Sequence, residues 1–283
     1  MKYQIIIPAH NEGNFLSAHL QSVVDQSLPP AKVVVVNDHS TDNTEDIIDR
    51  FTSQYNFITK LNTTSSTEHM PGSKVINAFN KGLEQIDPDY DFLVKLDADT
   101  ILPQNYFETI SQIFRQHPKV GIAGGFIYEQ DQDGKWILNH PMDRDHVRGA
   151  FKAYSRNCFK AIGGLKNAMG WDTVDELLAQ YHAFAIHTEE SLAVKHLRPL
   201  GKAYNQKARL LQGKAMYTMR YGFIITLIAS IKMAVKHKKP LVFWDNMRGY
   251  YLAKKSKSPF LVNASEGRFI RHLRWKKIRA KLF

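Results

Sequence analysis

Two carboxylates at the end of an apolar segment are the residues of this chain whose spacing points most directly to chemistry. The segment Phe92–Leu96 is short and mostly apolar, and Asp97, Ala98 and Asp99 follow it. A segment of this kind predicts a buried strand, whose carboxyl end is where open α/β sheets bind ligands. If the strand continued, its alternation would turn both carboxylates to one side. Such a pair suits a divalent cation that also holds a phosphate, although a simple turn is the alternative explanation.

The elements that would position these carboxylates follow from the hydrophobic pattern of residues 1–128. Short apolar segments alternate there with apolar residues at helical spacing. This alternation predicts the α/β class, a mostly parallel sheet with crossover helices. The predicted strands are Tyr3–Ile7, Lys32–Val36, Asn56–Leu61, Phe92–Leu96 and Val120–Tyr128. From residue 129 a polar turn and a hairpin begin, so an α+β segment is expected over 129–212, before a helical extension over 213–283.

The ends of the first two predicted strands add polar side chains to the same edge of the sheet. Pro8-Ala9-His10-Asn11-Glu12 follows the first strand, and Asn37-Asp38-His39-Ser40-Thr41-Asp42 follows the second. Asn11 or Glu12 would also serve as a helix cap. Asp42, three residues before Glu45, predicts a cap with a capping-box partner. Asp38 lies too early for that cap, and its carboxylate could accept the N–H of a nucleobase.

Charge divides the chain into an acidic part and a strongly basic part. Residues 195–283 carry 22 Lys and Arg against 2 Asp and Glu, whereas residues 1–194 carry 16 against 25. The apolar run Tyr221–Ile231 is too short to cross a bilayer alone. In Arg268–Arg279 apolar residues interleave with cations, which suits an interfacial helix on anionic lipid. No nucleic-acid recognition module accompanies the charge, so an anionic membrane surface is the expected partner and nucleic acid is not. Packing of these helices on the rest of the chain is the alternative.

Cysteine content and the N-terminus bear on location. The single cysteine, Cys158, excludes an intramolecular disulfide framework and fits a reducing compartment. The chain enters Tyr3–Ile7 without a signal-peptide pattern. With the basic extension, these features predict a cytoplasmic protein that is peripheral at the inner face of the cell membrane.

Three of these segments occur in an order and spacing typical of a known family. Pro8–Glu12, Val35–Asp42 and Lys95–Asp99 resemble the successive motifs of glycosyltransferase family 2, inverting enzymes of the GT-A fold that use nucleotide sugars. The resemblance covers residues 3 to about 200 well and the tail more loosely. It implies a metal-dependent hexosyltransferase that moves a sugar from a nucleoside-diphosphate sugar to an acceptor hydroxyl. A glycan or lipid-linked acceptor is expected, in cell-surface polysaccharide or glycolipid synthesis.

The resemblance also implies roles for residues near the nucleotide. Pro8, Ala9 and Glu12 would line a nucleoside pocket in which Asp38 holds the base. Asp97 and Asp99 would form the D-x-D motif, with Asp99 the most direct ligand of Mg²⁺ or Mn²⁺ on the diphosphate. The loop Pro71-Gly72 precedes a predicted helix on which Lys74 would reach a phosphate, although an ordinary surface lysine is the alternative.

Family members place the catalytic base at the start of an acidic helix, usually in a Glu-Asp pair. Here Trp171 replaces the Glu, so this chain departs from the pattern, and Asp172 aligns as the base. Asp175 and Glu176 are the alternatives if the register differs. Acidic residues at the start of a helix predicted over Asp175–Ala185 would also stabilise its dipole. A histidine after this helix would add a metal ligand; His196 is the first candidate and His187 the second.

Other functions fit parts of the sequence. Leu96–Thr100 resembles the motif of haloacid-dehalogenase phosphatases, but that motif lies on the first strand of their core, and here about three β–α units precede it. A sugar nucleotidyltransferase would have a glycine-rich, basic loop after its first strand, where this chain has Pro8–Glu12. A non-catalytic protein that binds membranes or nucleic acid would explain the basic tail but not the acidic strand ends.

Overall fold

The computed structural model describes residues 1–64, 73–139, 146–198 and 206–282. The chain forms two compact units, one of Met1–Leu165 with His182–Leu200 and one of Lys166–Tyr181 with Gly201–Phe283. These divisions differ from the boundaries expected at residues 129 and 213. Residue 213 falls inside a helix, α7 (Gln206–Thr218), because the helical pattern of the extension begins earlier than its apolar run. The resemblance also implies that residues 1–128 form a nucleotide-sugar-binding half and residues 129–212 an acceptor-side, catalytic half of one domain, and this division stays a prediction.

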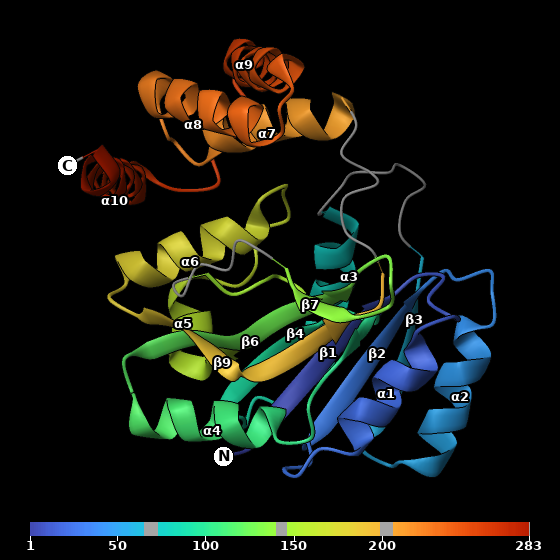
Figure 1. The fold of residues 1–283 in the computed structure, drawn as a ribbon. Coiled ribbons are helices and arrows are strands. Elements are labelled where there is room, and N and C mark those ends of the chain that lie inside the picture. Colours follow the sequence, from blue (N-terminus) through green and yellow to red (C-terminus); the bar gives the residue numbers. More distant parts are fainter. Residues whose placement is uncertain (65–72, 140–145, 199–205, 283) are drawn as a thin grey trace. The chain divides into compact units, whose positions relative to one another are not determined.

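A mixed nine-stranded sheet forms the centre of the first unit (Figure 1). Its strand order is β3-β2-β1-β4-β8-β6-β9-β5, with β7 paired to β6. The first four strands of this order are parallel, and β8 is antiparallel to both β4 and β6. The strands are β1 (Tyr3–Ala9), β2 (Lys32–Asp38), β3 (Ile58–Thr63), β4 (Phe92–Leu96), β5 (Thr100–Ile101), β6 (Val120–Gln130), β7 (Trp136–Leu138), β8 (Phe151–Ser155) and β9 (Ala185–His196). The predicted α/β class is confirmed, and the predicted hairpin is the β6–β7 pair.

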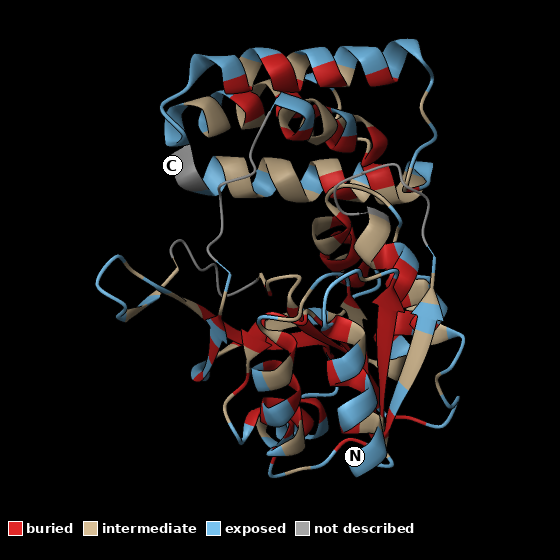
Figure 2. Cartoon of the chain, turned by 90° about the vertical axis from the view of Figure 1, so that its right-hand side faces the viewer, coloured by how far each residue is buried: buried red, intermediate tan, exposed pale blue. Residues whose placement is uncertain are grey.

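Helices cover both faces of this sheet, which explains why its central strands are mostly apolar. Helices α1 (Leu16–Val24), α2 (Thr44–Gln54) and α4 (Tyr106–Gln116) lie on one face, and α3 (Ser73–Leu83) and α5 (Arg156–Ala161) on the other (Figure 1). On the first face, the ring of Tyr3 lies 4.8 Å from that of Phe92 and 4.7 Å from that of Phe107 in α4. On the second, Ile6 lies so close to Gly82 of α3 that a Cβ there would approach it to 2.5 Å. Figure 2 shows the resulting buried core.

The loops that follow β1 and β2 are joined to each other at the carboxyl edge of the sheet. The Asn11 amide donates to Ser40 Oγ at 3.1 Å, and the Thr41 amide donates to Asn11 Oδ1 at 2.8 Å. Asn11 and His39 adopt the left-handed conformation, with φ of 55° and 53°, which Asn and His tolerate better than most residues. These bonds hold the two polar loops together beside the strand end of Asp38.

The capping box predicted at Asp42 and Glu45 is wrong. Helix α2 begins after Asn43 instead, and Asp42 accepts backbone N–H bonds from Gly13 and Thr44 at 3.0 Å each. Glu45 binds Lys60 of β3 at 2.9 Å rather than reaching back to the helix start. Partners on neighbouring elements therefore compete successfully with the local capping pattern.

The helix predicted over Asp175–Ala185 forms with different limits. Helix α6 comprises Trp171–Tyr181, and Ala185 is already the first residue of β9. Gly170, with φ of 79°, turns the chain into the helix, and Ala183, with φ of 63°, separates it from the strand. The helix starts early because Trp171 continues the buried stripe of Val174 and Leu178.

Within the described residues, the second unit is built from helices. They are α6, α7, α8 (Phe223–Lys236), α9 (Pro240–Lys255) and α10 (Ala264–Leu282). Helices α7 and α9 approach closely at glycines: a Cβ at Gly249 would lie 2.0 Å from the carbonyl oxygen of Leu210. Helix α10 packs on α6, where the rings of Phe269 and Tyr181 lie 5.6 Å apart. Among the described helices, none combines the length and the apolar character that crossing a bilayer requires.

Candidate active site

The turn between β4 and β5 carries the two carboxylates singled out by the sequence. Strand β4 ends at Leu96, so the strand alternation expected for Asp97 and Asp99 does not extend to them. The Asp97 amide donates to the carbonyl of Ala150 at 2.7 Å, and Thr100 Oγ1 donates to the carbonyl of Asp97 at 3.0 Å. In this fixed turn the two carboxylates contact different groups.

Asp99 is buried beside two residues: His196, the last residue of β9, and Arg198, which follows that strand. Its Oδ2 is 3.5 Å from His196 Nε2 and 3.3 Å from Arg198 Nε. The pairing of β5 with β9 places Thr100 opposite His196, and the Leu197 amide donates to the Asp99 carbonyl at 2.8 Å. Residues distant in sequence are thereby brought into one site.

The Asp99–His196 pair shifts both pKa values. Burial alone would raise the pKa of Asp99, but His196 and Arg198 hold it below its usual value. Burial likewise would lower the pKa of His196, but Asp99 raises it above its usual value. The pair is therefore an ionised carboxylate beside an imidazole that readily takes a proton.

Asp97 accepts a hydrogen bond from Lys95, a buried lysine of β4. Lys95 is almost completely buried in β4, where its ammonium donates to Asp97 Oδ1 and, at 3.0 Å, to the carbonyl of Gly149. A buried ammonium needs such partners, because an unpaired charge in the core is costly. The Asp97 side chain remains one-third exposed. Lys95 thus fixes the position of one oxygen of this carboxylate, Oδ1.

Glu12 and Asp99 share one cationic partner, Arg198. Its carboxylate binds the Arg198 guanidinium, which also contacts Asp99. Burial raises the pKa of Glu12 to about 7, with Arg198 acting against that increase and Asp99 adding to it. The half-exposed Arg198 therefore neutralises two acidic residues at once.

Sequence reasoning missed four residues of this cluster: His19, Lys95, Glu129 and Arg198. The fully buried His19 of α1 donates from Nδ1 to the carbonyl of Thr100 at 2.6 Å, and burial lowers its pKa. Glu129 of β6 lies 3.5 Å from His196 Nδ1. Only Lys95 had a local signal, a charge within an apolar strand. The others need the β5–β9 and β6–β9 pairings to become neighbours.

The chemistry of this cluster fits a divalent cation. Asp99 Oδ1 is buried and has no hydrogen-bond partner among the described residues, although a buried carboxylate oxygen normally has one. Mg²⁺ typically takes one or two carboxylates from the protein and completes its shell with phosphate oxygens and water. Within the described residues, no three His, Cys, Asp or Glu side chains form a complete metal cage. The site therefore suits a cation that arrives with a phosphorylated ligand.

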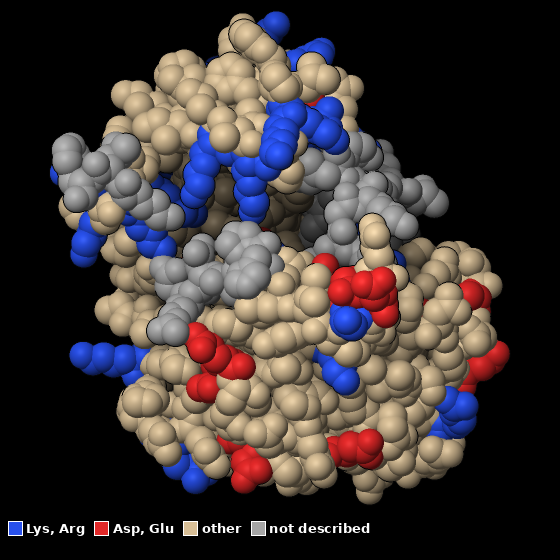
Figure 3. All heavy atoms as spheres, in the orientation of Figure 1, with Lys and Arg blue, Asp and Glu red and all other residues tan. Residues whose placement is uncertain are grey.

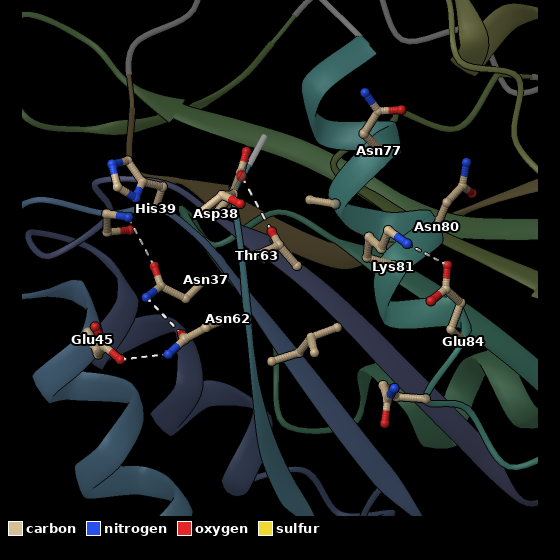
Figure 4. Close-up of a pocket in the computed structure, with 15 residues that line it drawn as sticks. Asn37, Asp38, His39, Glu45, Asn62, Thr63, Asn77, Asn80, Lys81 and Glu84 are labelled. Atoms are coloured by element: carbon tan, nitrogen blue, oxygen red, sulfur yellow. Dashed lines mark hydrogen bonds and ion pairs between the residues drawn. The ribbon is translucent and has the colours of Figure 1, made fainter. Parts of the chain in front are cut away.

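A polar cavity of about 770 Å³ opens at the carboxyl ends of β2 and β3. Asp38, the last residue of β2, accepts a hydrogen bond from Thr63 Oγ1 at 3.3 Å, and Asn37 donates to Asn62 Oδ1 at 3.1 Å. Figure 4 shows these side chains on one side of the cavity and Asn77, Asn80 and Lys81 of α3 on the other. The volume is that of a small-molecule site, and the amides and carboxylate offer both donors and acceptors.

The remaining residues expected near the nucleotide lie outside this cavity lining. Pro8 and Ala9 are the last residues of β1, and Lys74 lies in the first turn of α3, one turn before Asn77.

His187, the second candidate for a histidine metal ligand, lies on β9, where it pairs with Ala123 of β6. Its ring is 3.4 Å from Glu189 and stacks near His117. It is therefore His196 that lies beside Asp99. Pro71 and Gly72 fall outside the described residues.

The three candidate bases belong to α6 in the second unit. Asp172 lies in its first turn and is partly exposed, whereas Asp175 and Glu176 are buried. The Glu176 amide donates to Asp175 Oδ1 at 2.6 Å, so this carboxylate is engaged within the helix. Of the three side chains, Asp172 is the most accessible to solvent.

Comparison with known proteins relates the chain to glycosyltransferases. The family model "Glycosyl transferase family 2" matches residues 4–178, more than half of the chain. Poly-beta-1,6-N-acetyl-D-glucosamine synthase from Staphylococcus epidermidis is 27% identical over 120 residues, which are 42% of this chain and 27% of that protein. Glycosyltransferase GlyG from Streptococcus pneumoniae is 26% identical over 134 residues, 47% of this chain and 42% of that protein. The match thus spans less than half of either relative.

Solved structures share the fold at lower identity. The S. aureus TarS structure with UDP-GlcNAc aligns with a TM-score of 0.57 and 19% identity, over 76% of this chain and 67% of that chain. The mannosyltransferase PcManGT from Pyrobaculum calidifontis, with GDP-Man and Mn²⁺, aligns with a TM-score of 0.59 and 15% identity, over 100% of this chain and 81% of that chain. The architecture described above, C-terminal helices included, therefore has counterparts among solved proteins.

Proposed function

Because the chain belongs to glycosyl transferase family 2, we propose that it transfers a sugar from a nucleoside-diphosphate sugar to an acceptor hydroxyl with inversion. One observation carries this proposal: the Asp38 cavity and the Asp99 cluster lie at the carboxyl edge of the same parallel strands. That edge is where open α/β sheets bind nucleotides. The family also sets aside the phosphatase and nucleotidyltransferase alternatives.

The donor's nucleoside would occupy the Asp38 cavity. A carboxylate at the strand end accepts an N–H of the base, and the amides of Asn37 and Asn62 supply further polar contacts. Pro8 and Ala9 would bound the pocket from β1, and Lys74 would reach a phosphate from the start of α3. The TarS and PcManGT structures are complexes with UDP-GlcNAc and GDP-Man, so these are the first donors to test.

Asp99 would hold the divalent cation, Mg²⁺ or Mn²⁺, with Asp97 and His196 as its neighbours in the site. When bound, the cation neutralises the negative charge of the departing diphosphate. The unsatisfied Oδ1 of Asp99 is the free protein ligand, and Lys95 keeps Asp97 oriented toward the same turn. His196 keeps Asp99 ionised, because the imidazole holds the pKa of that carboxyl low.

Asp172 would act as the catalytic base. Its carboxylate takes the proton from the acceptor hydroxyl as that oxygen attacks the anomeric carbon. The bond from this carbon to the diphosphate breaks on the opposite side, so one displacement inverts the configuration. Partial exposure suits Asp172 for contact with an acceptor, whereas Asp175 and Glu176 are buried in α6.

Cleavage of a donor panel tests the proposed function. The protein is incubated with UDP-GlcNAc, GDP-Man and other nucleotide sugars, with Mn²⁺ or with EDTA, and the nucleoside diphosphate and the sugar are measured. Water then serves as the acceptor, and NMR gives the anomeric configuration of the released sugar. We expect cation-dependent release of nucleoside diphosphate and an inverted sugar. Release of inorganic phosphate, or a retained configuration, would contradict the proposal.

Replacing Asp38 with alanine is expected to weaken nucleoside-diphosphate binding by about tenfold to a hundredfold, because one charge-assisted hydrogen bond is lost. Isothermal titration with the nucleoside diphosphate gives the affinity. Glu84→Gln on the α3 side of the cavity is the matched control and should change it less than threefold. Equal weakening in both variants would mean that Asp38 does not hold the base.

Replacing Arg198 with glutamine is expected to tighten Mn²⁺ binding to the free protein by about threefold to tenfold. The guanidinium lies 3.3 Å from Asp99 Oδ2, so it competes with any cation for that carboxylate. Electron paramagnetic resonance measures free Mn²⁺ during titration, and the exposed Arg115→Gln in α4 serves as the control. Unchanged or weaker Mn²⁺ binding would show that Arg198 does not compete.

A glycan or lipid-linked acceptor, used in building a cell-surface polysaccharide or glycolipid, agrees with the polysaccharide synthase among the relatives. The excess of cations in residues 195–283 supports attachment of the second unit to an anionic membrane, the inner face of the cell membrane included. Such attachment would bring the enzyme to a lipid-linked acceptor.

A further inference from the structure

Large apolar side chains are exposed mainly on one part of the second unit. Of the ten large apolar side chains exposed among the described residues, nine lie between residues 223 and 260. Ile224, Ile231 and Val235 follow one face of α8 at helical spacing, and Leu241 and Trp244 begin the exposed face of α9. Exposed apolar groups gathered in this way indicate an interaction surface.

The turn between α8 and α9 combines these apolar groups with lysines. Ile231, Val235 and Trp244 line one shallow hollow together with Lys238 and Lys239. Leu241, next to the turn, is 65% exposed, Trp244 66% and Val235 72%. We call these six residues, Ile231, Val235, Lys238, Lys239, Leu241 and Trp244, the α8–α9 corner.

The charged side chains exposed on α8 and α9 around this corner are all positive. Lys232, Lys236, Arg248 and Lys254 are all exposed on α8 and α9. The one acid between residues 223 and 255, Asp245, is buried and binds Arg209 at 2.7 Å. Figure 3 shows the Lys and Arg side chains that gather on the helical unit. A partner of this surface must therefore be both anionic and able to accept apolar groups.

Helix α10, which the sequence suggested as the interfacial helix, uses apolar side chains and two of its arginines inside the unit, whereas Arg268, Lys276 and Arg279 are exposed. Ile270 is buried, and Phe269 packs on Tyr181. Arg271 donates to the carbonyl of Arg220 at 2.9 Å, and Arg274 donates to the Tyr221 hydroxyl at 2.6 Å. Insertion of these groups of α10 into a membrane would break these contacts, whereas contact through the corner breaks none of them.

We propose that the α8–α9 corner inserts into the headgroup region of an anionic membrane. Val235, Ile231 and Leu241 would enter the acyl boundary, Trp244 would lie at the interface, and Lys238 and Lys239 would bind lipid phosphates. A second copy docked corner to corner is disfavoured as the occupant because the two lysine clusters would repel each other. Nucleic acid offers no place for the aliphatic side chains. This inference rests on the membrane attachment within the proposed function and assigns it to particular residues.

Vesicle flotation of the full chain tests this proposal. Vesicles of phosphatidylcholine alone are compared with vesicles that contain about 30% phosphatidylglycerol. The full chain should float with the anionic vesicles, and Val235→Gln/Trp244→Gln should lower the bound-to-free ratio by about tenfold or more. Ile137→Gln, at an exposed apolar position of β7, is the matched control and should float like wild type. Lys238→Gln/Lys239→Gln should reduce flotation, whereas Lys276→Gln/Arg279→Gln in α10 should not. The tryptophan fluorescence of the full chain should also shift to shorter wavelength on binding, and this shift should be smaller in Val235→Gln/Trp244→Gln.

Three results would overturn the proposal. The first is wild-type flotation by the Val235→Gln/Trp244→Gln variant, and the second is loss of flotation only in the α10 variant. The third is a dimer in light scattering that this corner variant dissociates while vesicle binding stays unchanged. Flotation requires neither sugar nor Mn²⁺, and the corner variants should cleave a donor in solution like wild type. The two measurements therefore distinguish failure of the membrane proposal from failure of the transferase proposal.

Discussion

Replacing Asp99 with alanine is expected to lower cation-dependent sugar transfer by about 10³-fold, since charge neutralisation of the leaving diphosphate contributes several kcal/mol. The same variant should lose tight Mn²⁺ binding, because Asp99 Oδ1, which has no hydrogen-bond partner among the described residues, is the proposed protein ligand. Donor cleavage gives the rate, and Mn²⁺ titration by electron paramagnetic resonance gives a readout independent of activity.

Asp99 is buried, so a second variant separates loss of the cation from loss of packing. Asp99→Asn keeps the size of the side chain and a partner for His196, and it should lose activity to a similar extent while the melting temperature changes little. Asp133→Asn, an exposed position in the β6–β7 turn, is the charge control. Full activity in Asp99→Ala, with normal Mn²⁺ dependence, would refute the assignment.

Replacing Asp172 with asparagine is expected to lower the turnover number by about 10³-fold, within the range that general-base catalysis supplies. The amide cannot accept the acceptor's proton, but its size preserves the first turn of α6. Nucleoside-diphosphate affinity should stay within about twofold, because Asp172 acts on the acceptor and not on the nucleotide. Steady-state kinetics and isothermal titration measure the two quantities.

Asp175→Asn and Glu176→Gln are the matched variants for this prediction. Both side chains are buried in α6, and an asparagine at 175 can still accept the Glu176 amide proton. Each variant should retain turnover within about tenfold of wild type. If one of them loses about 10³-fold while Asp172→Asn stays active, the base lies in the other register of the helix.

The parallel part of the fold was predictable because its signals are local. Strands buried on both faces are mostly apolar, and crossover helices show their own period. For this reason β4 has the predicted limits, and Asp38 lies at the end of β2. The limits of α6 were less predictable. They depend on the conformations of Gly170 and Ala183 and on burial of Trp171, and the composition of the segment specifies none of these.

The Asp99 cluster was predictable only in part because its members meet through strand pairing. Asp97 and Asp99 are adjacent in sequence, whereas Arg198 and Glu129 reach Asp99 and His196 only after β9 pairs with β5 and β6. Glu12 was expected beside the nucleoside, and that role stays a prediction; its ion pair with Arg198 could not be read from the sequence, because the two residues are far apart in the chain. The charge of the tail was evident from composition, yet which helix exposes its apolar side chains depends on how α10 packs on α6.

A crystal structure with a nucleoside diphosphate and Mn²⁺ tests the central claim most directly, namely that the carboxyl edge of this sheet holds a nucleotide-sugar donor. The predicted result places the base in the cavity beside Asp38, the diphosphate and the cation at Asp99, and Asp172 toward the position of the sugar. A nucleotide bound elsewhere, or a cation held without Asp99, would contradict it.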